Sequence, residues 1–182
     1  LGCECEEGVK RNKGRLGAKE GPLALRKAMS NLPVHFGDDV SLWDAGNVIC
    51  EGDRLEQAQQ QLGEYVNRII AANLLPIILG GGHEVAWGSF QGLIPSLKKD
   101  RRLGILNFDA HFDLRQLQNG ASSGTPFLQI LEWGKENHPS ISYFAWGIQQ
   151  SGNTQALFQT ADDYGVQYLT MDHLRKLNQD EQ

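Results

Sequence analysis

Residues 102–115 read RLGILNFDAHFDLR, and this stretch joins an apolar run to three residues of the types that bind metal ions. The apolar run is nearly continuous, as is typical of a parallel strand that is buried on both faces. Asp109, His111 and Asp113 follow at every second position, so their side chains share one face of an extended segment. Charges held this close need burial partners or a cation between them. The stretch therefore predicts a buried strand with a metal site at its carboxyl end.

A second stretch of the same kind lies upstream. LLPIILGGGHE, residues 74–84, is an apolar run ended by three glycines, which predicts a buried strand, a sharp turn and then His83. Ligands of open parallel sheets collect at the carboxyl ends of the strands. If the two strands are neighbours, His83 converges with the three residues above on one crevice. For His83 alone, a turn histidine bonded to the backbone is the alternative, and a polar loop can carry D-x-H-x-D by chance.

Around these two strands the sequence alternates between strand and helix patterns. We expect a first strand that buries Cys3 and Cys5 on one face, and a last helix capped by Asp172. Strands that alternate with helices predict an α/β fold, a three-layer α/β/α sandwich with a mostly parallel sheet, as one domain over residues 1–182. The other expected elements are helices over residues 23–32, 53–73, 84–97 (with Pro95 able to end it early), 126–134 and 153–164, and strands over residues 141–148 and 166–169.

The composition excludes several classes of partner. The 182 residues carry a net charge of −5 and no long basic run, which argues against nucleic acid or an anionic membrane as a partner. No apolar stretch approaches the roughly 20 residues that span a bilayer. The three cysteines form no disulfide framework, so we expect a reducing, cytoplasmic location. Cys3 and Cys5 could bind a soft metal, with a buried pair as the alternative, and Cys50 is interpreted as core. The chain opens without Met, and we expect residues upstream.

Four motifs carry a resemblance to a known family. GGGHE at 80–84, FDAHFD at 108–113 and SGTPF at 123–127 resemble motifs of the ureohydrolase (arginase–agmatinase) superfamily, and GVKRNKGRLGAKEGP at 8–22 resembles its opening motif. Within the superfamily, NKGR before LGA, Arg115 after FDAHFDL, and SSGTPF resemble the formimidoylglutamase branch. The resemblance covers nearly the whole sequence. It implies an arginase-like fold and a site for two Mn²⁺ ions.

The resemblance also implies a role for each ligand. His83 would bind one manganese ion and His111 the other, and Asp109 would bridge them. Asp113 would bind the same ion as His83 and accept a hydrogen bond from a bridging hydroxide, which makes it the candidate catalytic residue. The hydroxide would attack the formimino carbon of N-formimino-L-glutamate and release glutamate and formamide. By ligand type alone, imidazole and carboxylate without thiolate suit Mn²⁺, Fe²⁺ or Zn²⁺.

Two departures from the superfamily pattern matter. The family takes two further aspartates from an S-x-D-x-D segment, which these residues do not contain. We therefore expect this piece to lack the C-terminal third of the fold and to bind two metals poorly. Ser123 stands where arginases and agmatinases carry histidine, which argues against those two activities. A plain turn before a helix that starts with proline is the alternative for this motif.

The implied substrate is small and acidic, with two carboxylates that guanidinium groups can bind in a bidentate manner. Arg115 is the best placed arginine, and Arg15 and Asn12 lie in a glycine-containing loop after the first strand. Ser123 completes the candidate substrate residues, and surface salt bridges are the alternative for the arginines. Two alternatives for the function of the protein stay open. It is another ureohydrolase, such as a guanidino-acid hydrolase or an agmatinase-like enzyme, or it is a non-catalytic truncated remnant. Since the superfamily often forms trimers or hexamers, a homo-oligomer is compatible with the resemblance.

Overall fold

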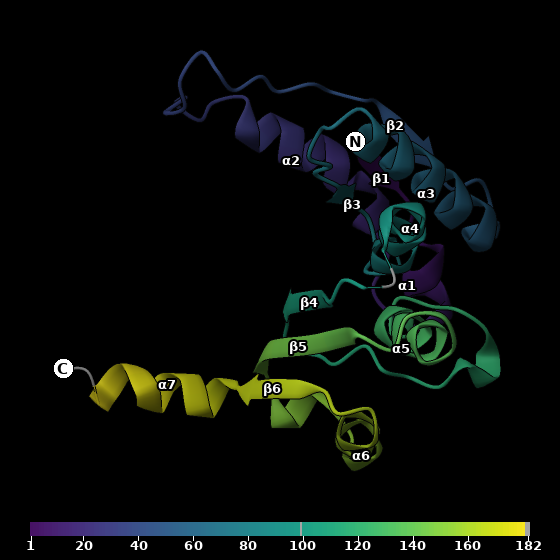
Figure 1. Ribbon diagram of the computed structural model, residues 1–182, viewed down its shortest axis with the longest axis vertical. Coiled ribbons are helices and arrows are strands. Elements are labelled where there is room, and N and C mark those ends of the chain that lie inside the picture. Colours follow the sequence, from purple (N-terminus) through teal and green to yellow (C-terminus); the bar gives the residue numbers. More distant parts are fainter. Residues whose placement is uncertain (99, 181–182) are drawn as a thin grey trace. The chain divides into compact units, whose positions relative to one another are not determined.

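The computed structural model describes residues 1–98 and 100–180, and the chain divides into two compact units (Figure 1). The first unit comprises Leu1–Ser96 and Ala121–Ser123, and the second comprises the described residues of Leu97–Gly120 and Gly124–Gln182. Each unit combines helices with a parallel sheet, which confirms the predicted α/β class. The expectation of a single domain over residues 1–182 stays a prediction.

The first unit contains a short three-stranded sheet of order β2-β1-β3, and both strand pairs are parallel. Cys3 of the central strand faces Val48 on one side and Gly80 on the other. The strands are β1 (Gly2–Glu4), β2 (Asn47–Ile49) and β3 (Leu79–Gly80). The helices are α1 (Glu7–Arg11), α2 (Gly21–Met29), α3 (Leu55–Ala71) and α4 (Val85–Leu93), with 3₁₀ turns at Ala18–Glu20 and Ile94–Ser96.

The core of the first unit lies between this sheet and α3. The helix predicted over residues 53–73 is confirmed as α3. Its apolar stripe begins with Leu55, Ala58, Leu62 and Val66, and these four residues are buried together with residues of β1 and β2. Burial raises the pKa of Cys3 to about 12, and this disfavours the thiolate that a soft metal requires. The structural interpretation of Cys3 and Cys5 is therefore favoured, and half-buried Cys50 packs against the same core. The buried residues are Leu1, Cys3, Cys5, Val48, Leu55, Ala58, Leu62 and Val66.

Helices α3 and α4 approach each other through glycines. A Cβ atom added to Gly92 would lie 2.4 Å from the carbonyl oxygen of Gly63 and 2.6 Å from the Cβ of Val66. Only glycine permits this approach, which seats α4 on α3 and so fixes the segment that follows β3. The α-helix ends at Leu93, and Pro95 lies in the 3₁₀ turn after it, which confirms the predicted early end.

The strand predicted over residues 74–82 is mostly absent. Only Leu79 and Gly80 pair with β1, and Leu75 is 85% exposed. Pro76 lacks the N–H that a ladder needs, and β1 is only three residues long, so few partners are available. The prediction of a buried strand is therefore wrong for residues 74–78. The short elements α1 and β2 were not predicted, because neither is long enough to show a period.

The second unit contains a sheet of order β4-β5-β6, again with parallel pairs. Its strands are β4 (Leu103–Phe108), β5 (Ile141–Ile148) and β6 (Gln167–Thr170), as the sequence predicts to within a few residues. Its helices are α5 (Pro126–Asn137), α6 (Gln155–Asp163) and α7 (Met171–Asp180), with 3₁₀ turns at Leu117–Asn119 and Gln150–Gly152.

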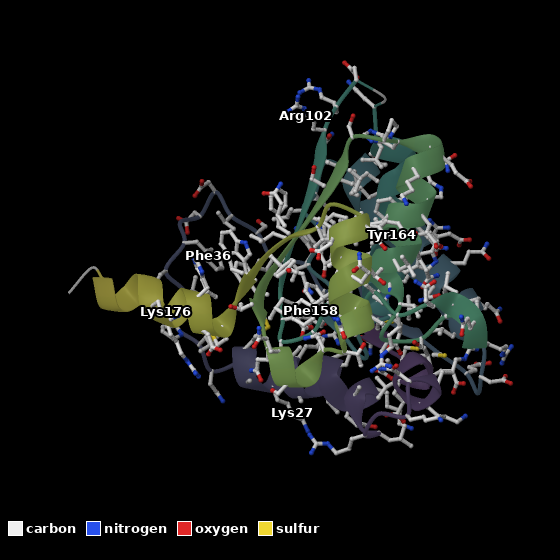
Figure 2. The ribbon with its side chains drawn as sticks, turned by 90° about the horizontal axis from the view of Figure 1, so that it is seen from below. Lys27, Phe36, Arg102, Phe158, Tyr164 and Lys176 are labelled. Atoms are coloured by element: carbon white, nitrogen blue, oxygen red, sulfur yellow. The ribbon has the colours of Figure 1, made fainter. Side chains whose placement is uncertain are left out.

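One face of this second sheet is buried by aromatic side chains. Tyr143 of β5 stacks on Phe127 of α5 with ring centroids 4.4 Å apart. Tyr168 of β6 meets Phe158 of α6 edge-to-face at 5.8 Å, and Figure 2 labels Phe158 on its helix. Tyr168 is paired with Ala145, which lies two residues after Tyr143 on β5, so α5 and α6 cover the same face.

The opposite face of this sheet is partly open in the described residues. Leu106 and Phe108 of β4 are 49% and 72% exposed, and Phe108 meets Trp146 of β5 edge-to-face. The prediction that this strand is buried on both faces is therefore wrong for the part of the chain that the structure describes. An apolar run indicates that its side chains are suited to burial, but it does not indicate which other elements cover them.

The start of α7 also differs from the prediction. The hydroxyl of Thr170 accepts a hydrogen bond from the backbone N–H of His173 at 3.2 Å, which is the bond of an N-cap residue. Asp172 lies inside the first turn, with its carboxylate 3.9 Å from Arg175, so the prediction that it caps the helix is wrong. Across residues 1–98 and 100–180, no helix has the length and apolar character needed to cross a membrane.

Candidate metal centre

The segment after β4 brings two of the predicted ligands together. The backbone N–H of His111 donates to Asp109 Oδ1 at 2.9 Å, and His111 Nδ1 lies 3.3 Å from the same oxygen. The imidazole and the carboxylate are therefore neighbours, but they meet across a bend at residues 110–111 and not on one face of an extended segment. Asp109 is about one quarter exposed, and His111 is exposed, so both can be reached from solvent.

Asp113 has an unusual backbone. Its φ is +49°, in the left-handed region that few residues other than glycine adopt. Aspartate tolerates this region better than most residues, but strain of this kind persists only where the surroundings enforce it. Phe112 and Leu114, the two neighbours of Asp113, are both completely buried. The turn that presents Asp113 is therefore imposed by the packing on both sides of it.

Phe112 anchors the segment to the core of the second unit. Its ring meets Phe158 of α6 at 5.0 Å and Tyr168 of β6 at 5.1 Å, both edge-to-face. Because Phe112 lies between His111 and Asp113 in the sequence, its burial holds the backbone from which those two candidate ligands project.

Two polar residues hold the same backbone by hydrogen bonds. Asn153 Oδ1 accepts from the N–H of Phe112 at 3.1 Å, and Asn153 Nδ2 donates to the carbonyl of Ala110 at 2.8 Å. The Tyr143 hydroxyl donates to the carbonyl of Phe112 at 3.1 Å and accepts from Asn107 Nδ2 at 3.0 Å. The sequence reasoning missed these supports. A polar Asn107 inside an apolar strand is the one local signal that could have revealed them.

The Tyr143 phenol makes stability depend on alkaline pH. Burial, followed by the charges of Asp113 and Asp109, raises its pKa above the ordinary value of about 10, against the hydrogen bond from Asn107. A pKa raised on folding means that its stabilisation is complete below pH 10 and is lost as the pH rises toward the folded-state pKa. We expect Tyr143→Phe to cost about 1–2 kcal/mol at pH 8 and to reduce the further loss between pH 8 and 11.

Urea unfolding of the 182-residue chain at several pH values, with a chelator present, measures this effect. The chelator removes divalent metal ions, so that no bound metal changes the charge around Asp109 and Asp113 during the titration. Tyr65→Phe on α3 is the control. An alkaline loss that is the same in Tyr143→Phe and in the parent chain would contradict the prediction.

His83 lies in the first unit, in the turn between β3 and α4. The N–H of Gly82 donates to the carbonyl of Cys5 at 2.9 Å, and the N–H of Ala86 donates to the carbonyl of His83 at 3.0 Å. Gly81 has a φ of +49°, and an added Cβ would lie 2.6 Å from the carbonyl oxygen of Cys3. The glycines therefore allow the turn to pack closely against the end of β1, and His83 follows directly after the glycines.

Glu84, next to His83, is a buried carboxylate that sequence reasoning did not single out. It is 1% exposed, and burial raises its pKa above the ordinary value. Its Oε1 accepts from the backbone N–H of Gly8 at 3.0 Å, and its carbonyl accepts from Gln59 Nε2 at 3.0 Å. Glu84 thus ties the turn that carries His83 to α1 and to α3.

The four candidate substrate residues divide between the units. Asn12 and Ser123 both donate their backbone N–H to the carbonyl of Gly8, each at 3.0 Å, so the structure brings these two segments together. Arg15 is exposed in the loop after α1, and this short helix separates the predicted loop from the first strand. Arg115 is exposed in the second unit, and its N–H donates to the carbonyl of Gly124 at 2.8 Å. Their roles toward a substrate stay predictions.

Parallel sheets with aspartate and histidine after the ends of their strands define an α/β protein whose donors suit divalent metal ions. The model of the Arginase family matches residues 1–182, and the chain belongs to this family. This confirms the resemblance inferred from the motifs.

Individual relatives agree with this assignment. The formimidoylglutamase of Geobacillus thermodenitrificans is 45% identical over 174 residues, and that of Geobacillus kaustophilus is 48% identical over 174 residues. Both alignments cover 96% of this chain and 53% of the relative, so the chain spans about half the length of these curated relatives. The crystal structure of Trypanosoma cruzi formiminoglutamase with Mn²⁺₂ matches with a TM-score of 0.82 at 28% identity, and the match covers 96% of this chain and 60% of that one.

Proposed function

We propose that the protein is a metal-dependent hydrolase that cleaves a C–N bond of N-formimino-L-glutamate to give glutamate and formamide. The observation that carries this proposal is the 45–48% identity to curated formimidoylglutamases over 96% of the chain. Ser123 stands in the position where arginases and agmatinases carry histidine. This difference also favours formiminoglutamate hydrolysis over hydrolysis of a guanidino compound.

The donor set fits two Mn²⁺ ions held by His83, Asp109, His111 and Asp113. These side chains offer carboxylate oxygen and imidazole nitrogen without thiolate, and His111 already lies beside the Asp109 carboxylate. The Mn²⁺ named with the Trypanosoma cruzi structure belongs to that protein and supports the same choice of metal for this one. When bound, two such ions lower the pKa of a shared water and supply hydroxide near neutral pH.

The remaining roles fall to residues of this chain. Asp113, held in its left-handed turn by buried neighbours, would accept a hydrogen bond from the attacking oxygen and keep that oxygen oriented. Arg115 and Arg15 would bind the substrate carboxylates by charge-assisted hydrogen bonds, with Asn12 and Ser123 as neutral donors. The substrate is thus a small acidic molecule, which suits a chain without a basic run for nucleic acid or a membrane. We also propose a cytoplasmic location and a homo-oligomer.

Product analysis of the full-length protein tests the activity. After loading with Mn²⁺, it is incubated separately with formiminoglutamate, agmatine, arginine and guanidinobutyrate. We expect formamide and glutamate from the first compound, loss of activity on chelation, and recovery with Mn²⁺. Urea release that exceeds formamide release would overturn the proposal in favour of a guanidino-acid hydrolase or an agmatinase-like enzyme. No turnover of any of the four compounds, with no bound metal, would indicate a non-catalytic remnant.

A further inference from the structure

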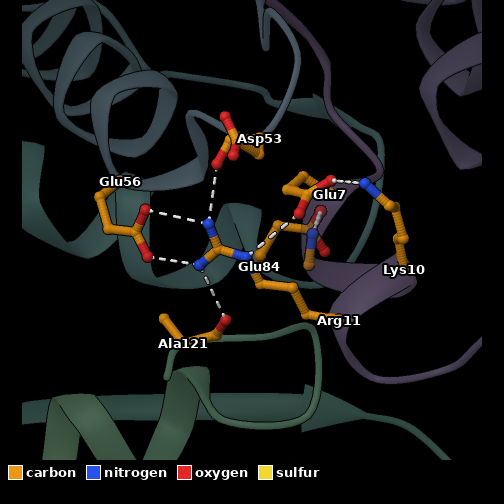
Figure 3. A network of polar contacts seen from close by, with 8 residues as sticks. Glu7, Lys10, Arg11, Asp53, Glu56, Glu84 and Ala121 are labelled. Carbon is orange, nitrogen blue, oxygen red and sulfur yellow. Dashed lines mark hydrogen bonds and ion pairs between the residues drawn. The ribbon is translucent and has the colours of Figure 1, made fainter. Parts of the chain in front are cut away.

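Arg11, the last residue of α1, lies at the centre of a polar network in the first unit (Figure 3). A guanidinium group has five N–H donors, and all five of them are used. Nε donates to Glu7 Oε1 at 3.3 Å, and Nη1 donates to Glu56 Oε1 and to the carbonyl of Ala121. Nη2 donates to Glu56 Oε2 at 3.2 Å and to the carbonyl of Asp53 at 2.8 Å. The side chain of Arg11 is 24% exposed, so much of it is shielded from water.

These bonds attach two separate parts of the chain to α1. Asp53 lies two residues before α3 and Glu56 lies in its first turn, whereas Ala121 directly precedes Ser122 and Ser123. The segment 121–123 is 110 residues from Arg11 in sequence, so nothing local fixes its position against α1. The contact with Ala121 and the bond from the Ser123 N–H to the carbonyl of Gly8 hold this segment from both ends.

Gly8, one turn before Asn12 in α1, joins the same segments on its other side. Its N–H donates to Glu84 Oε1 at 3.0 Å, while its carbonyl accepts from Ser123. A Cβ at Gly8 would lie 2.6 Å from the carboxyl carbon of Glu84, so this approach requires glycine. The helix therefore connects the turn that carries His83 with the segment that carries Ser123.

Helix α1 cannot hold this position by itself. It has five residues, and isolated helices of this length are not stable in water. Its place is set by tertiary bonds, and Arg11 supplies bonds to α3 on one side and to Ala121 on the other. Asn12 and the loop with Arg15 follow Arg11 directly, so the position of α1 also determines where this loop lies.

We propose that Arg11 is a positioning residue, which holds the 12–15 loop and the 121–123 segment in register for an acidic substrate. The proposal rests on the proposed function, because the substrate contacts of Asn12, Arg15 and Ser123 belong to it. Arg11 does not itself bind the substrate, since its donors are already engaged within the network.

Arg11→Lys separates charge from geometry. Lysine keeps the positive charge, but it has three donors on a single nitrogen and cannot hold Glu56 in a bidentate manner while it also reaches Ala121. In the full-length protein with Mn²⁺, we expect KM for formiminoglutamate to rise about tenfold, while kcat stays within about twofold and manganese content is unchanged. A higher KM with an unchanged kcat indicates that the substrate binds more weakly while the reacting groups are undamaged.

Hydrogen exchange supplies a readout that does not depend on activity. Mass spectrometry of peptides that contain Ser123 should show at least about tenfold faster exchange in Arg11→Lys and in Arg11→Ala. Glu56→Gln, which weakens the same network from the α3 side, should give a smaller change in the same direction.

Arg26→Lys is the matched control. Arg26 of α2 binds Asp44 in a bidentate manner at 2.9 and 2.7 Å and Asn47 at 2.7 Å, in the same unit but with no bond to the 121–123 segment among the described residues. It should change neither KM nor Ser123 exchange. Unchanged Ser123 exchange in Arg11→Ala, an unchanged KM in Arg11→Lys, or an equal KM rise in Arg26→Lys would each overturn the proposal. If the unsubstituted protein does not hydrolyse formiminoglutamate, the proposed function fails, and the exchange data alone decide whether Arg11 holds the segment.

Discussion

Asp109→Ala is expected to remove both manganese ions from the full-length protein and to lower kcat/KM by about 10³-fold or more. The resemblance implies that Asp109 would supply a ligand to both ions, in which case its loss would weaken both sites together. The local structure adds a second cause. Asp109 Oδ1 accepts the N–H of His111 at 2.9 Å and lies beside its ring, so the substitution also releases the neighbouring candidate ligand.

Metal analysis after gel filtration measures the first effect, and steady-state kinetics measure the second. Asp163→Ala is the control, because this carboxylate is exposed at the end of α6, where it accepts from Gln159 Nε2 at 2.9 Å. It should retain two ions and full activity. One ion retained in Asp109→Ala would assign Asp109 to a single metal, and two ions retained would remove it from the ligand set.

The segment after β4 could be predicted from sequence because both of its signals are local. An apolar run sets where the strand ends, and close spacing in the sequence keeps Asp109 and His111 together, although they meet across a bend, with His111 Nδ1 3.3 Å from Asp109 Oδ1. The stripe of α3 and the strand β5 were predictable for the same reason, since a repeating pattern over eight or more residues leaves little freedom.

The supports of the site could not be predicted in this way. Asn153 lies 41 residues from Phe112, and Arg11 lies 110 residues from Ala121, and no periodicity encodes which distant backbone groups a side chain will satisfy. The left-handed φ of Asp113 is similar, because it follows from the burial of its neighbours and not from its own preference. Local sequence thus indicates the chemistry of the segment, whereas long-range packing decides its shape.

Burial was predicted less well than strand position. Leu106 and Phe108 belong to a correctly predicted strand, yet both are exposed, because α5 and α6 cover the other face of the sheet. Leu75 is apolar but largely exposed, because Pro76 interrupts the ladder that would have drawn it into the sheet. An apolar side chain is buried only where a partner surface exists, and a single strand pattern holds no information about that surface.

Phe112→Ala should strongly destabilise the fold. We expect the free energy of unfolding of the 182-residue chain to fall by about 3–5 kcal/mol, because a fully buried ring is removed and leaves a cavity. Its two edge-to-face contacts, with Phe158 and Tyr168, are lost as well, and this places the expected loss in the upper half of that range. Urea unfolding in the presence of a chelator measures this loss without a contribution from metal binding.

Phe108→Ala is the matched control, since it removes the same ring four residues earlier from a side chain that is 72% exposed. It should cost less than about 1 kcal/mol, and Phe112→Leu should lie between the two.

The same substitutions distinguish the effect of Phe112 on packing from its effect on the placement of the ligands. If Phe112 holds His111 and Asp113 in position, then Phe112→Leu in the full-length protein will weaken manganese binding more than its stability loss accounts for, whereas Phe108→Ala will not. Equal losses of stability in Phe112→Ala and Phe108→Ala would show that Phe112 does not anchor the segment to the core.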